Sequence, residues 1–364
     1  RCNRFVYATT MTASWAAYDL GAWSDLYNYV TNVNEAISNL NKYSDFSDET
    51  TAEFLGQLYF FRGFLYFELM KRYKEVIIYD ENLDKIEANT PLSTEEEGWD
   101  FVESDFKSAA QKLPKNWSND DFGRITQGAV YAFLSSAMLY AKRWSAAKNA
   151  AGAVMDLEQY SLMSNYADAF GSGASGNREA ILEYNYDVSS IYHDFDDKFS
   201  PGGDNGIQQG GLGTPTQEMV ESYELAGTGG FPDWSEWHTT LGTTKTPPYE
   251  QLEPRFHASI LFNGAPWKGR SVEPYVDGAD GWCQYNESPT PAGRTTTGYY
   301  LRKLIDEDHD LSVNSSSTQS WIAVRYAEVL LNYAEACYHT DDENGANSAV
   351  KQIRTRAGLP YTSK

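Results

Sequence analysis

The sequence has few of the residues on which metal and redox chemistry depend. Its 364 residues include 3 cysteines and 5 histidines. Cys2, Cys283 and Cys337 show neither a C-x-x-C motif nor another metal-ligand spacing, and an odd count excludes complete pairing within the chain. The histidines form no H-E-x-x-H motif. The sequence therefore offers no support for a zinc enzyme or for a scaffold held together by disulfides.

Basic residues are scarce as well. The chain carries 29 Lys and Arg against 51 Asp and Glu, a formal net charge of -22. Nucleic acids require a basic surface, and anionic lipid headgroups attract one, so neither is a predicted partner. No apolar run approaches the length of a membrane span. If the protein associates with a membrane, we expect a lipid anchor that is not visible in this chain, because Cys2 follows no lipobox.

Recognisable catalytic motifs are missing too. There is no G-x-S-x-G nucleophile elbow. Gly171 to Gly176 satisfies G-x-G-x-x-G, but an expected strand follows it where a nucleotide-binding loop needs a helix. A glycoside hydrolase needs two carboxylates across a cleft, and nothing among the 51 acidic residues singles out such a pair. We predict that the protein is not an enzyme, with a glycoside hydrolase as the weaker alternative.

One acidic cluster fits a hard cation by ligand type alone. Asp194, Asp196 and Asp197 offer the oxygen ligands that calcium prefers. The segment lacks the glycine and the terminal glutamate of an EF-hand loop, so a solvated acidic loop is the favoured interpretation. We therefore predict no cofactor and keep a structural calcium ion as the weaker alternative.

Aromatic residues, in contrast, are abundant. The chain has 26 Tyr and 10 Trp, and aromatics make up 15% of its residues. Such side chains combine a flat apolar face with a polar edge. An acidic chain rich in them suits neutral ligands that offer C–H faces and hydroxyl groups, of which carbohydrates are the obvious candidates. The competing interpretation, that most of these rings pack in the core, applies to the majority of them.

The pattern of apolar residues predicts a mainly α fold. Ala327, Leu331, Ala334 and Tyr338 recur at three- and four-residue spacing, which indicates a helix stripe that faces a neighbour. Alanines let two helix axes come close, as in tetratricopeptide-like pairs. We expect such pairs at about 126–157 and 322–357. Further helices are predicted at about 23–40, 48–69 and 93–113.

A long segment, about 160–320, changes character. It is rich in Gly, Pro, Ser, Thr and Asp, and we predict strands at Ala180–Tyr184 and His257–Phe262. We expect three parts: a helical scaffold at 1–160, a loop-rich ligand-binding insertion at 161–320, and a last helix pair at 321–364. The predicted architecture is a tetratricopeptide-like helical repeat scaffold with a long loop-rich insertion that contains a few short strands.

Several segments along the chain match, in the same order, the sequence motifs of one protein family. Arg325–Ala336 reads R-Y-A-E-V-L-L-N-Y-A-E-A, and Ile353–Leu359 reads I-R-T-R-A-G-L. These two segments resemble sequences of the SusD/RagB family of outer-membrane glycan-binding lipoproteins, as do residues 23–37, 52–69, 215–224 and 297–303. The family's usual N-terminal leader and lipobox and its C-terminal stretch have no counterpart here. From that difference we expect the chain to be a fragment or a trimmed product.

The resemblance implies capture without catalysis. It predicts a protein on the outer membrane of a Gram-negative bacterium, facing the cell exterior, that binds an oligosaccharide or polysaccharide and delivers it to a SusC-like TonB-dependent transporter. A RagB-like protein that captures peptides is the alternative within the same class. A helical-repeat adaptor without a small-molecule site is the alternative from a different class.

The resemblance also implies where ligands bind. Family members place ligand-binding aromatics in the loop before the first of these helices and in the long insertion. The matching candidates, with side chains for the sugar hydroxyls, are Trp15, Tyr18, Asp19, Trp234, Trp237, Arg270, Trp282, Tyr285 and Asn286. We assign structural roles to the tryptophans expected on helix stripes or at helix starts, which are Trp23, Trp99, Trp144 and Trp321.

Overall fold

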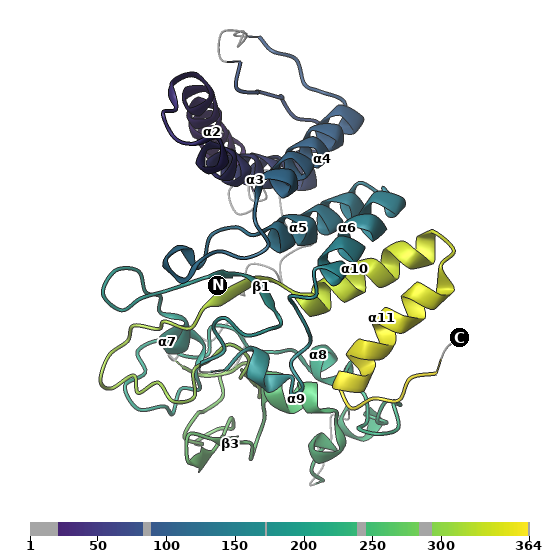
Figure 1. The fold of residues 1–364 in the computed structure, drawn as a ribbon. Coiled ribbons are helices and arrows are strands. Elements are labelled where there is room, and N and C mark those ends of the chain that lie inside the picture. Colours follow the sequence, from purple (N-terminus) through teal and green to yellow (C-terminus); the bar gives the residue numbers. More distant parts are fainter. Residues whose placement is uncertain (1–20, 83–88, 172, 239–244, 284–292, 363–364) are drawn as a thin grey trace.

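The computed structural model describes residues 21–82, 89–171, 173–238, 245–283 and 293–362. Most of its regular structure is helical, so the predicted fold class is confirmed. Figure 1 shows the long helices stacked from α2 at one end to α11 at the other. Their bounds are α2 Trp23–Tyr43, α3 Asp48–Tyr73, α4 Glu95–Lys112, α5 Gln127–Tyr140, α6 Trp144–Asp156, α10 Tyr326–His339 and α11 Glu343–Arg356.

Side-chain caps fix where several of these helices begin. The Ser47 hydroxyl accepts a hydrogen bond from the Thr50 amide at the start of α3. Thr94 and Glu97 form a reciprocal capping box at the start of α4. Thr126 and Asp342 cap α5 and α11 in the same way as Ser47 caps α3. These caps satisfy amide groups that have no partner inside the helix.

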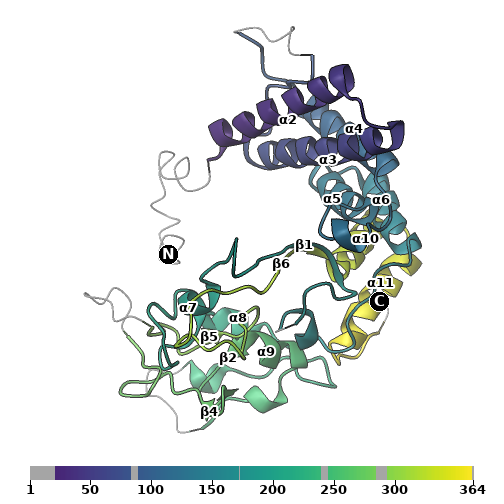
Figure 2. The same ribbon diagram turned by 60° about the vertical axis from the view of Figure 1, so that its left-hand side comes forward.

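The predicted helix pairs are confirmed, and they pack on one another although they are far apart in the sequence. α10 packs against both α5 and α6, and the views show the yellow C-terminal helices beside the teal ones (Figures 1 and 2). Alanines line the shared core of α5 and α6 and allow close approach. Those that are at most 4% exposed are Ala129, Ala132, Ala137, Ala147, Ala150 and Ala151.

The stripe predicted on α10 is only half right. Ala327 and Ala334 are buried, but Leu331 and Tyr338 are 50% and 75% exposed. The buried face instead includes Leu330 and is completed by Cys337. α5, α6 and α11 pack against α10, and this face is the one they cover.

The loop-rich insertion has a hydrophobic core of its own. Trp267, Tyr300 and Phe256 are its largest fully buried side chains. Short elements surround this core (Figure 2). They are α7 Phe195–Phe199, α8 Gln217–Glu221, α9 Pro254–Ser259, β2 Ile260–Leu261, β3 Pro266–Trp267, β4 Arg270–Ser271 and β5 Tyr300–Leu301. Along the chain there are also short 3-10 helices at η4 Asn119–Asp121, η5 Ala167–Ala169, η6 Ser235–Trp237 and η7 Tyr249–Gln251.

One antiparallel strand pair ties the insertion to the helices. β1 (Ala180–Tyr184), which was predicted as a strand, pairs with β6 (Trp321–Arg325), and β6 leads directly into α10. The strand predicted at His257–Phe262 is wrong over its first half. Pro254 occupies the first turn of α9, where its fixed φ suits a helix, and only Ile260 and Leu261 are extended.

Candidate functional site

A pocket of about 540 Å³ lies where the strand pair meets the insertion. Its volume falls within the usual range for small-ligand sites, roughly 300–1,000 Å³. The loop after β1, helix α7 and the segment before β6 supply most of its wall. The lining residues are Tyr186, His193, Asp194, Phe195, Lys198, Phe199, Gln209, Leu212, Leu304, Gln319, Ser320 and Trp321. We call it the aromatic pocket.

The strand pair exposes two aromatic side chains at its end. Tyr184 and Trp321 are register partners in the antiparallel pair, so their side chains leave the sheet on the same face. Tyr184 is 54% exposed and Trp321 is 51% exposed. Large apolar faces left uncovered at the rim of a pocket are typical of a binding surface rather than of a core.

Further rings continue from this pair into the pocket. The ring centroids of Tyr184 and Tyr186 are 5.0 Å apart, and those of Tyr186 and His193 are 4.4 Å apart. Phe195 lies 6.2 Å from His193 and 4.5 Å from Phe199, again between ring centroids. These rings form a continuous aromatic wall that offers flat faces to a ligand.

Polar groups among and beside these rings are held in place by hydrogen bonds. The Phe195 amide donates to His193 Nδ1 at 3.2 Å, so the ring proton is on Nε2, which donates to the Gln319 carbonyl at 3.0 Å. The Gln319 amide donates to Asp196 at 2.6 Å, and its Oε1 is buried without a partner among the described residues. At the rim, Lys198 pairs with Asp194 at 2.8 Å.

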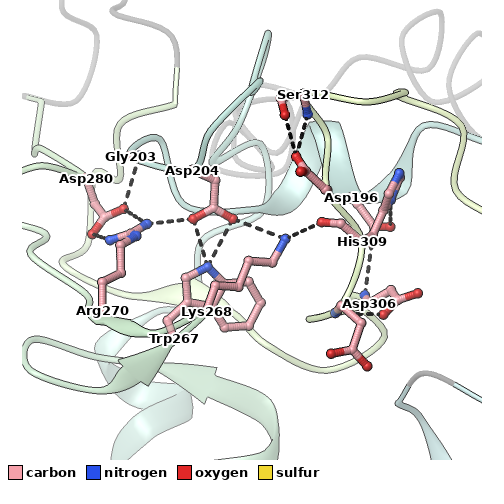
Figure 3. A network of polar contacts seen from close by, with 12 residues as sticks. Asp196, Gly203, Asp204, Trp267, Lys268, Arg270, Asp280, Asp306, His309 and Ser312 are labelled. Carbon is pink, nitrogen blue, oxygen red and sulfur yellow. Dashed lines mark hydrogen bonds and ion pairs between the residues drawn. The ribbon is translucent and has the colours of Figure 1, made fainter.

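A network of charged groups supports this wall from behind (Figure 3). His309 Nδ1 lies 2.7 Å from a carboxylate oxygen of the buried Asp196, and its Nε2 lies 3.1 Å from the Asn314 carbonyl. Both ring nitrogens of His309 therefore lie within hydrogen-bond distance of an oxygen atom. Lys268 donates to the His309 carbonyl at 2.8 Å and connects this group to Asp204.

Arg270 belongs to that network, which corrects its predicted role as a hydroxyl-binding side chain. Its guanidinium contacts Asp280 at 2.7 and 2.8 Å and Asp204 at 2.6 Å (Figure 3). The hydrogen bonds to Asp280 raise the pKa of Arg270 above its ordinary value. Asp204 also accepts from the buried Trp267 indole at 2.8 Å. Arg270 therefore stabilises the core of the insertion.

The calcium alternative is not supported by the side chains concerned. The carboxylates of Asp196 and Asp197 are buried and already accept hydrogen bonds, in the case of Asp197 from the Gln208 amide at 2.6 Å. Asp194 pairs with Lys198 instead. In the part of the chain that the structure describes, no three His, Cys, Asp or Glu side chains are grouped as metal ligands.

Of the tryptophans predicted as ligand residues, Trp234, Trp237 and Trp282 lie within the described residues, and none of these three lines the aromatic pocket. Trp234 is 6% exposed and packs in the core of the insertion, so its predicted exposure is wrong. Trp237 is partly buried against it, and its indole donates to the Lys245 carbonyl at 3.1 Å. Trp282 is 38% exposed. Trp15, Tyr18, Asp19, Tyr285 and Asn286 lie outside the described residues.

Trp321 is the site residue that sequence reasoning missed. We expected it to be a structural residue at the start of a helix, but it begins a strand and half of its surface is exposed. The available signal was the alternation of Tyr184 and Tyr186, which places both rings on one side of an extended segment. Trp23, Trp99 and Trp144 do pack against helix neighbours, as predicted.

Trp321 also borders a second pocket, of about 640 Å³, on its other side. Helices α3, α5 and α10 form this groove with β6. Its lining combines phenylalanines with charged side chains and is made up of Phe64, Phe67, Glu68, Lys71, Phe133, Ser136, Leu139, Tyr140, Trp321, Ala323, Val324, Glu328, Asn332 and Glu335. We call it the helical groove.

Among the described residues, no helix is both long enough and apolar enough to span a membrane.

Comparison with known families gives two matches. A family model described as the SusD family matches residues 177–364. A second, described as starch-binding associating with outer membrane, matches residues 3–139.

Individual relatives agree with these matches. A SusD-like protein of Bacteroides ovatus is 23% identical over 333 residues, which are 87% of this chain and 55% of that protein. The crystal structure of a SusD-like protein from Bacteroides fragilis has a TM-score of 0.81 at 28% identity and covers 94% of this chain and 68% of its own. A SusD-like carbohydrate-binding protein from the same species shares the fold, with a TM-score of 0.79 at 21% identity, 94% coverage of this chain and 66% of that chain. The chain thus spans little more than half the length of the Bacteroides ovatus relative.

Proposed function

Because the SusD family model covers residues 177–364, more than half of the chain, the protein belongs to the SusD family, and we propose that it captures oligosaccharides or polysaccharides without cleaving them. The observation that carries this proposal is the aromatic pocket with Tyr184 and Trp321 exposed at its edge. Sugar rings have apolar C–H faces that stack on such side chains, and covering apolar surface contributes about 25 cal/mol per Å².

Polar groups beside the rings suit the hydroxyl groups of a sugar. Gln209 and Ser320 line the pocket, and the side-chain oxygen Oε1 of Gln319 has no partner among the described residues. Lys198 and Asp194 add a donor and an acceptor at the rim. This mixture of flat apolar walls and a few fixed polar groups is what a neutral ligand with hydroxyl groups requires.

The acidic residues of the pocket argue for binding rather than hydrolysis. Asp194 is the one carboxylate among the described residues that line the aromatic pocket, and it is paired with Lys198. The carboxylate of Asp196 is buried behind the wall and occupied by His309. Glycoside hydrolysis needs a second carboxylate across the cleft, about 5–9.5 Å from the first.

We place this activity at the surface of the outer membrane of a Gram-negative bacterium, with delivery of the glycan to a SusC-like TonB-dependent transporter. Support comes from the family match at residues 3–139, whose description includes association with the outer membrane. The net charge of -22 favours a neutral ligand over a nucleic acid.

The predicted residues outside the aromatic pocket keep a place in the proposal where their position allows it. Trp282, at 38% exposed, is proposed as an additional stacking residue, and Trp237 as a partly covered one. Trp15, Tyr18, Asp19, Tyr285 and Asn286 stay predictions.

Calorimetric titration with maltoheptaose, laminarihexaose and xylogluco-oligosaccharides tests the proposal. We expect at least one to bind and Trp321→Ala to weaken it about tenfold, which corresponds to about 1.4 kcal/mol for a stacked face. Tyr338→Ala is the control, because Tyr338 is an exposed ring, 75% accessible against 51% for Trp321, that lines neither pocket beside Trp321. Incubation of these glycans with the protein should release no reducing ends above those of a protein-free blank.

Two results would contradict this function. One is the absence of binding to every glycan in the panel. The other is equal affinity of the Trp321→Ala variant and the parent while both melt at the same temperature. Released reducing ends would instead support a glycoside hydrolase.

Peptide capture is the second candidate, and the helical groove favours it. Its walls are phenylalanines with Glu68, Glu328 and Glu335 along the charged side. Such a groove suits an extended peptide with apolar and basic side chains. In this case the peptide binds the helical groove and the glycan binds the aromatic pocket, and the two pockets share only Trp321 among their lining residues. The peptide should therefore displace a second peptide more effectively than it displaces the glycan.

A further inference from the structure

A third pocket, of about 270 Å³, lies beside the aromatic pocket, with the β1 segment between them. The loop after η4, the segment before β1 and β1 itself form its walls. Amide, guanidinium and aromatic side chains predominate in the lining, which comprises Asn116, Trp117, Phe122, Gly123, Arg124, Thr126, Gln159, Tyr160, Gly176, Asn177, Arg178, Ala180, Ile181, Leu182, Glu183 and Asn185. We call it the amide pocket.

Different residues of the β1 segment line the two pockets. Tyr186 lines the aromatic pocket, whereas residues 180–183 and Asn185 line the amide pocket. The wall between the pockets is fixed because Ser320, which lines the aromatic pocket, donates a hydrogen bond to Asn185 Oδ1 at 2.8 Å.

Glu183 has an unused acceptor in this pocket. Its Oε2 accepts a hydrogen bond from the Gly176 amide at 2.7 Å. Its Oε1 is buried and has no hydrogen-bond partner among the described residues. Burial raises the pKa of Glu183, and the Gly176 amide opposes that shift only in part. A buried carboxylate oxygen without a donor is unfavourable, and a ligand that brings a donor removes that penalty.

Aromatic faces lie next to this carboxylate. Phe122 is 66% exposed, and its Cζ is 3.6 Å from the position that a Cβ on Gly176 would take. The Arg124 guanidinium lies 5.3 Å from the centre of the Trp117 ring. The Glu183 carboxylate is hydrogen-bonded to the Gly176 amide, and the Phe122 ring lies close to the same glycine. The carboxylate and the ring therefore both lie next to Gly176 in this pocket.

Amides complete the chemistry of the pocket. Asn116 donates to Gln159 Oε1 at 2.8 Å, which holds both side chains at the edge. Asn177 donates to the Ala174 carbonyl at 2.7 Å and accepts from the Glu179 amide at 2.8 Å, so its side chain is fixed as well. Fixed amides with one free carboxylate oxygen and a ring face match a compact molecule that carries several hydroxyl groups.

We propose that the amide pocket binds a single sugar-sized ring through a hydroxyl group that donates to Glu183 Oε1 while an apolar face of the ring lies against Phe122. Its volume of about 270 Å³ is below the usual range for drug-sized ligands and admits one ring rather than a chain. This site is separate from the aromatic pocket and does not rest on the function proposed for it.

The probe set for this site is glucose, galactose and mannose, each added to the full chain labelled with ¹³C at glutamate side-chain carboxyls. We expect one of them to shift the Glu183 resonance and to lower the pKa of Glu183, because a donated hydrogen bond favours the ionised form. Glu183→Gln keeps one side-chain oxygen that can accept from the Gly176 amide. It replaces the other oxygen, Oε1, by an NH₂ group, which is a donor, and removes the charge. It should weaken binding about tenfold.

Matched variants keep the result interpretable. Phe122→Ala, at an exposed position, should weaken binding without lowering the melting temperature. Trp321→Ala should leave the Glu183 response unchanged, since Trp321 does not line the amide pocket. The proposal is overturned if no probe moves the Glu183 resonance, or if Glu183→Gln binds as the parent does. Either outcome leaves the Trp321 titration, and with it the proposed function, unaffected.

Discussion

The tryptophans of this protein differ in how much of each indole is covered by neighbouring side chains. Trp234 packs against Trp237, with ring centroids 5.8 Å apart, and near Tyr249 at 6.4 Å. Trp321 instead stands half exposed between two pockets. Local sequence suggested the reverse, because Trp234 follows a run of glycines and Trp321 precedes a strong helix pattern.

The burial of Trp234 leads to a prediction about stability. Trp234→Ala should lower the free energy of unfolding by roughly 3–5 kcal/mol, since it removes a large side chain from a packed core. Trp282→Ala should destabilise the protein less, because Trp282 is 38% exposed and therefore loses less buried surface. Denaturant unfolding of both variants measures the two values. Equal destabilisation by the two substitutions would contradict the assignment.

Arg270 is a second residue whose contacts could not be predicted from its residue type and local sequence. Its partners Asp280 and Asp204 are 10 and 66 residues away in the sequence. An arginine in a loop-rich segment next to aromatics fits a hydroxyl-binding role by residue type alone. Its involvement in an ion-pair network follows only from chain folding that brings the two aspartates to it (Figure 3).

At the scale of single elements, local signals determined most helix starts. Thr94 and Glu97 form a capping box at the start of α4, where the sequence predicted a helix from about residue 93. Hydrogen bonds from Thr94 lower the pKa of Glu97, which is consistent with an ionised acid at the first turn. Such caps need only three or four neighbouring residues, so they can be recognised without knowledge of the fold.

The cap of α4 can be tested directly. Thr94→Ala removes the acceptor for the Glu97 amide and should cost about 1 kcal/mol of unfolding free energy. Thr94→Ser keeps a hydroxyl group at the same place and should restore most of that loss. Thermal unfolding of the two variants beside the parent gives the comparison. A Thr94→Ala variant as stable as the parent would show that the cap does not contribute.

The exposed side of α10 could not be read from its own sequence. Apolar residues at both three- and four-residue spacings permit two overlapping stripes, through Leu331 and Tyr338 or through Leu330 and Cys337. Helices α5, α6 and α11 select the second stripe by covering it. The choice between two amphipathic faces therefore depends on the partners and not on the periodicity.

At the scale of the whole molecule, ion pairs connect the last helix pair to the insertion. Arg354 in α11 makes two hydrogen bonds of 2.8 Å to Glu224, which follows α8. Arg354 holds the pKa of Glu224 below its ordinary value. The glutamate is 14% exposed and the arginine 27%, so solvent screens the pair only in part.

This pair predicts a pH dependence with a definite sign. A carboxylate whose pKa is lowered in the folded state stabilises the protein above its unfolded pKa, near 4.3, and loses that contribution as pH falls through the folded value. Glu224→Gln should therefore be about 1 kcal/mol less stable than the parent at neutral pH and should approach the parent's stability below the folded-state pKa of Glu224.

Denaturant unfolding across this pH range measures that difference. Asp121→Asn is a suitable control, because Asp121 pairs with Arg124 at an exposed surface site and should contribute close to nothing. A difference between Glu224→Gln and the parent that stays constant down to acid pH would contradict the assignment.

The sequence by itself determined the helical class, the two tetratricopeptide-like pairs, strand β1 and the family to which the ordered motifs point. These features depend on residues close together in the chain: caps, alanine spacing and alternation. Scarce cysteine and histidine and a net charge of -22 also disfavour several functional classes on composition alone.

Only the tertiary structure decided which aromatic residues face a ligand. The aromatic pocket forms because β1 and β6, about 140 residues apart, pair and bring Tyr184 opposite Trp321. The same pairing turns Glu183 toward the amide pocket. Burial of a side chain depends on surfaces contributed by distant segments, so neither composition nor local periodicity distinguishes Trp234 in a core from Trp321 at a rim.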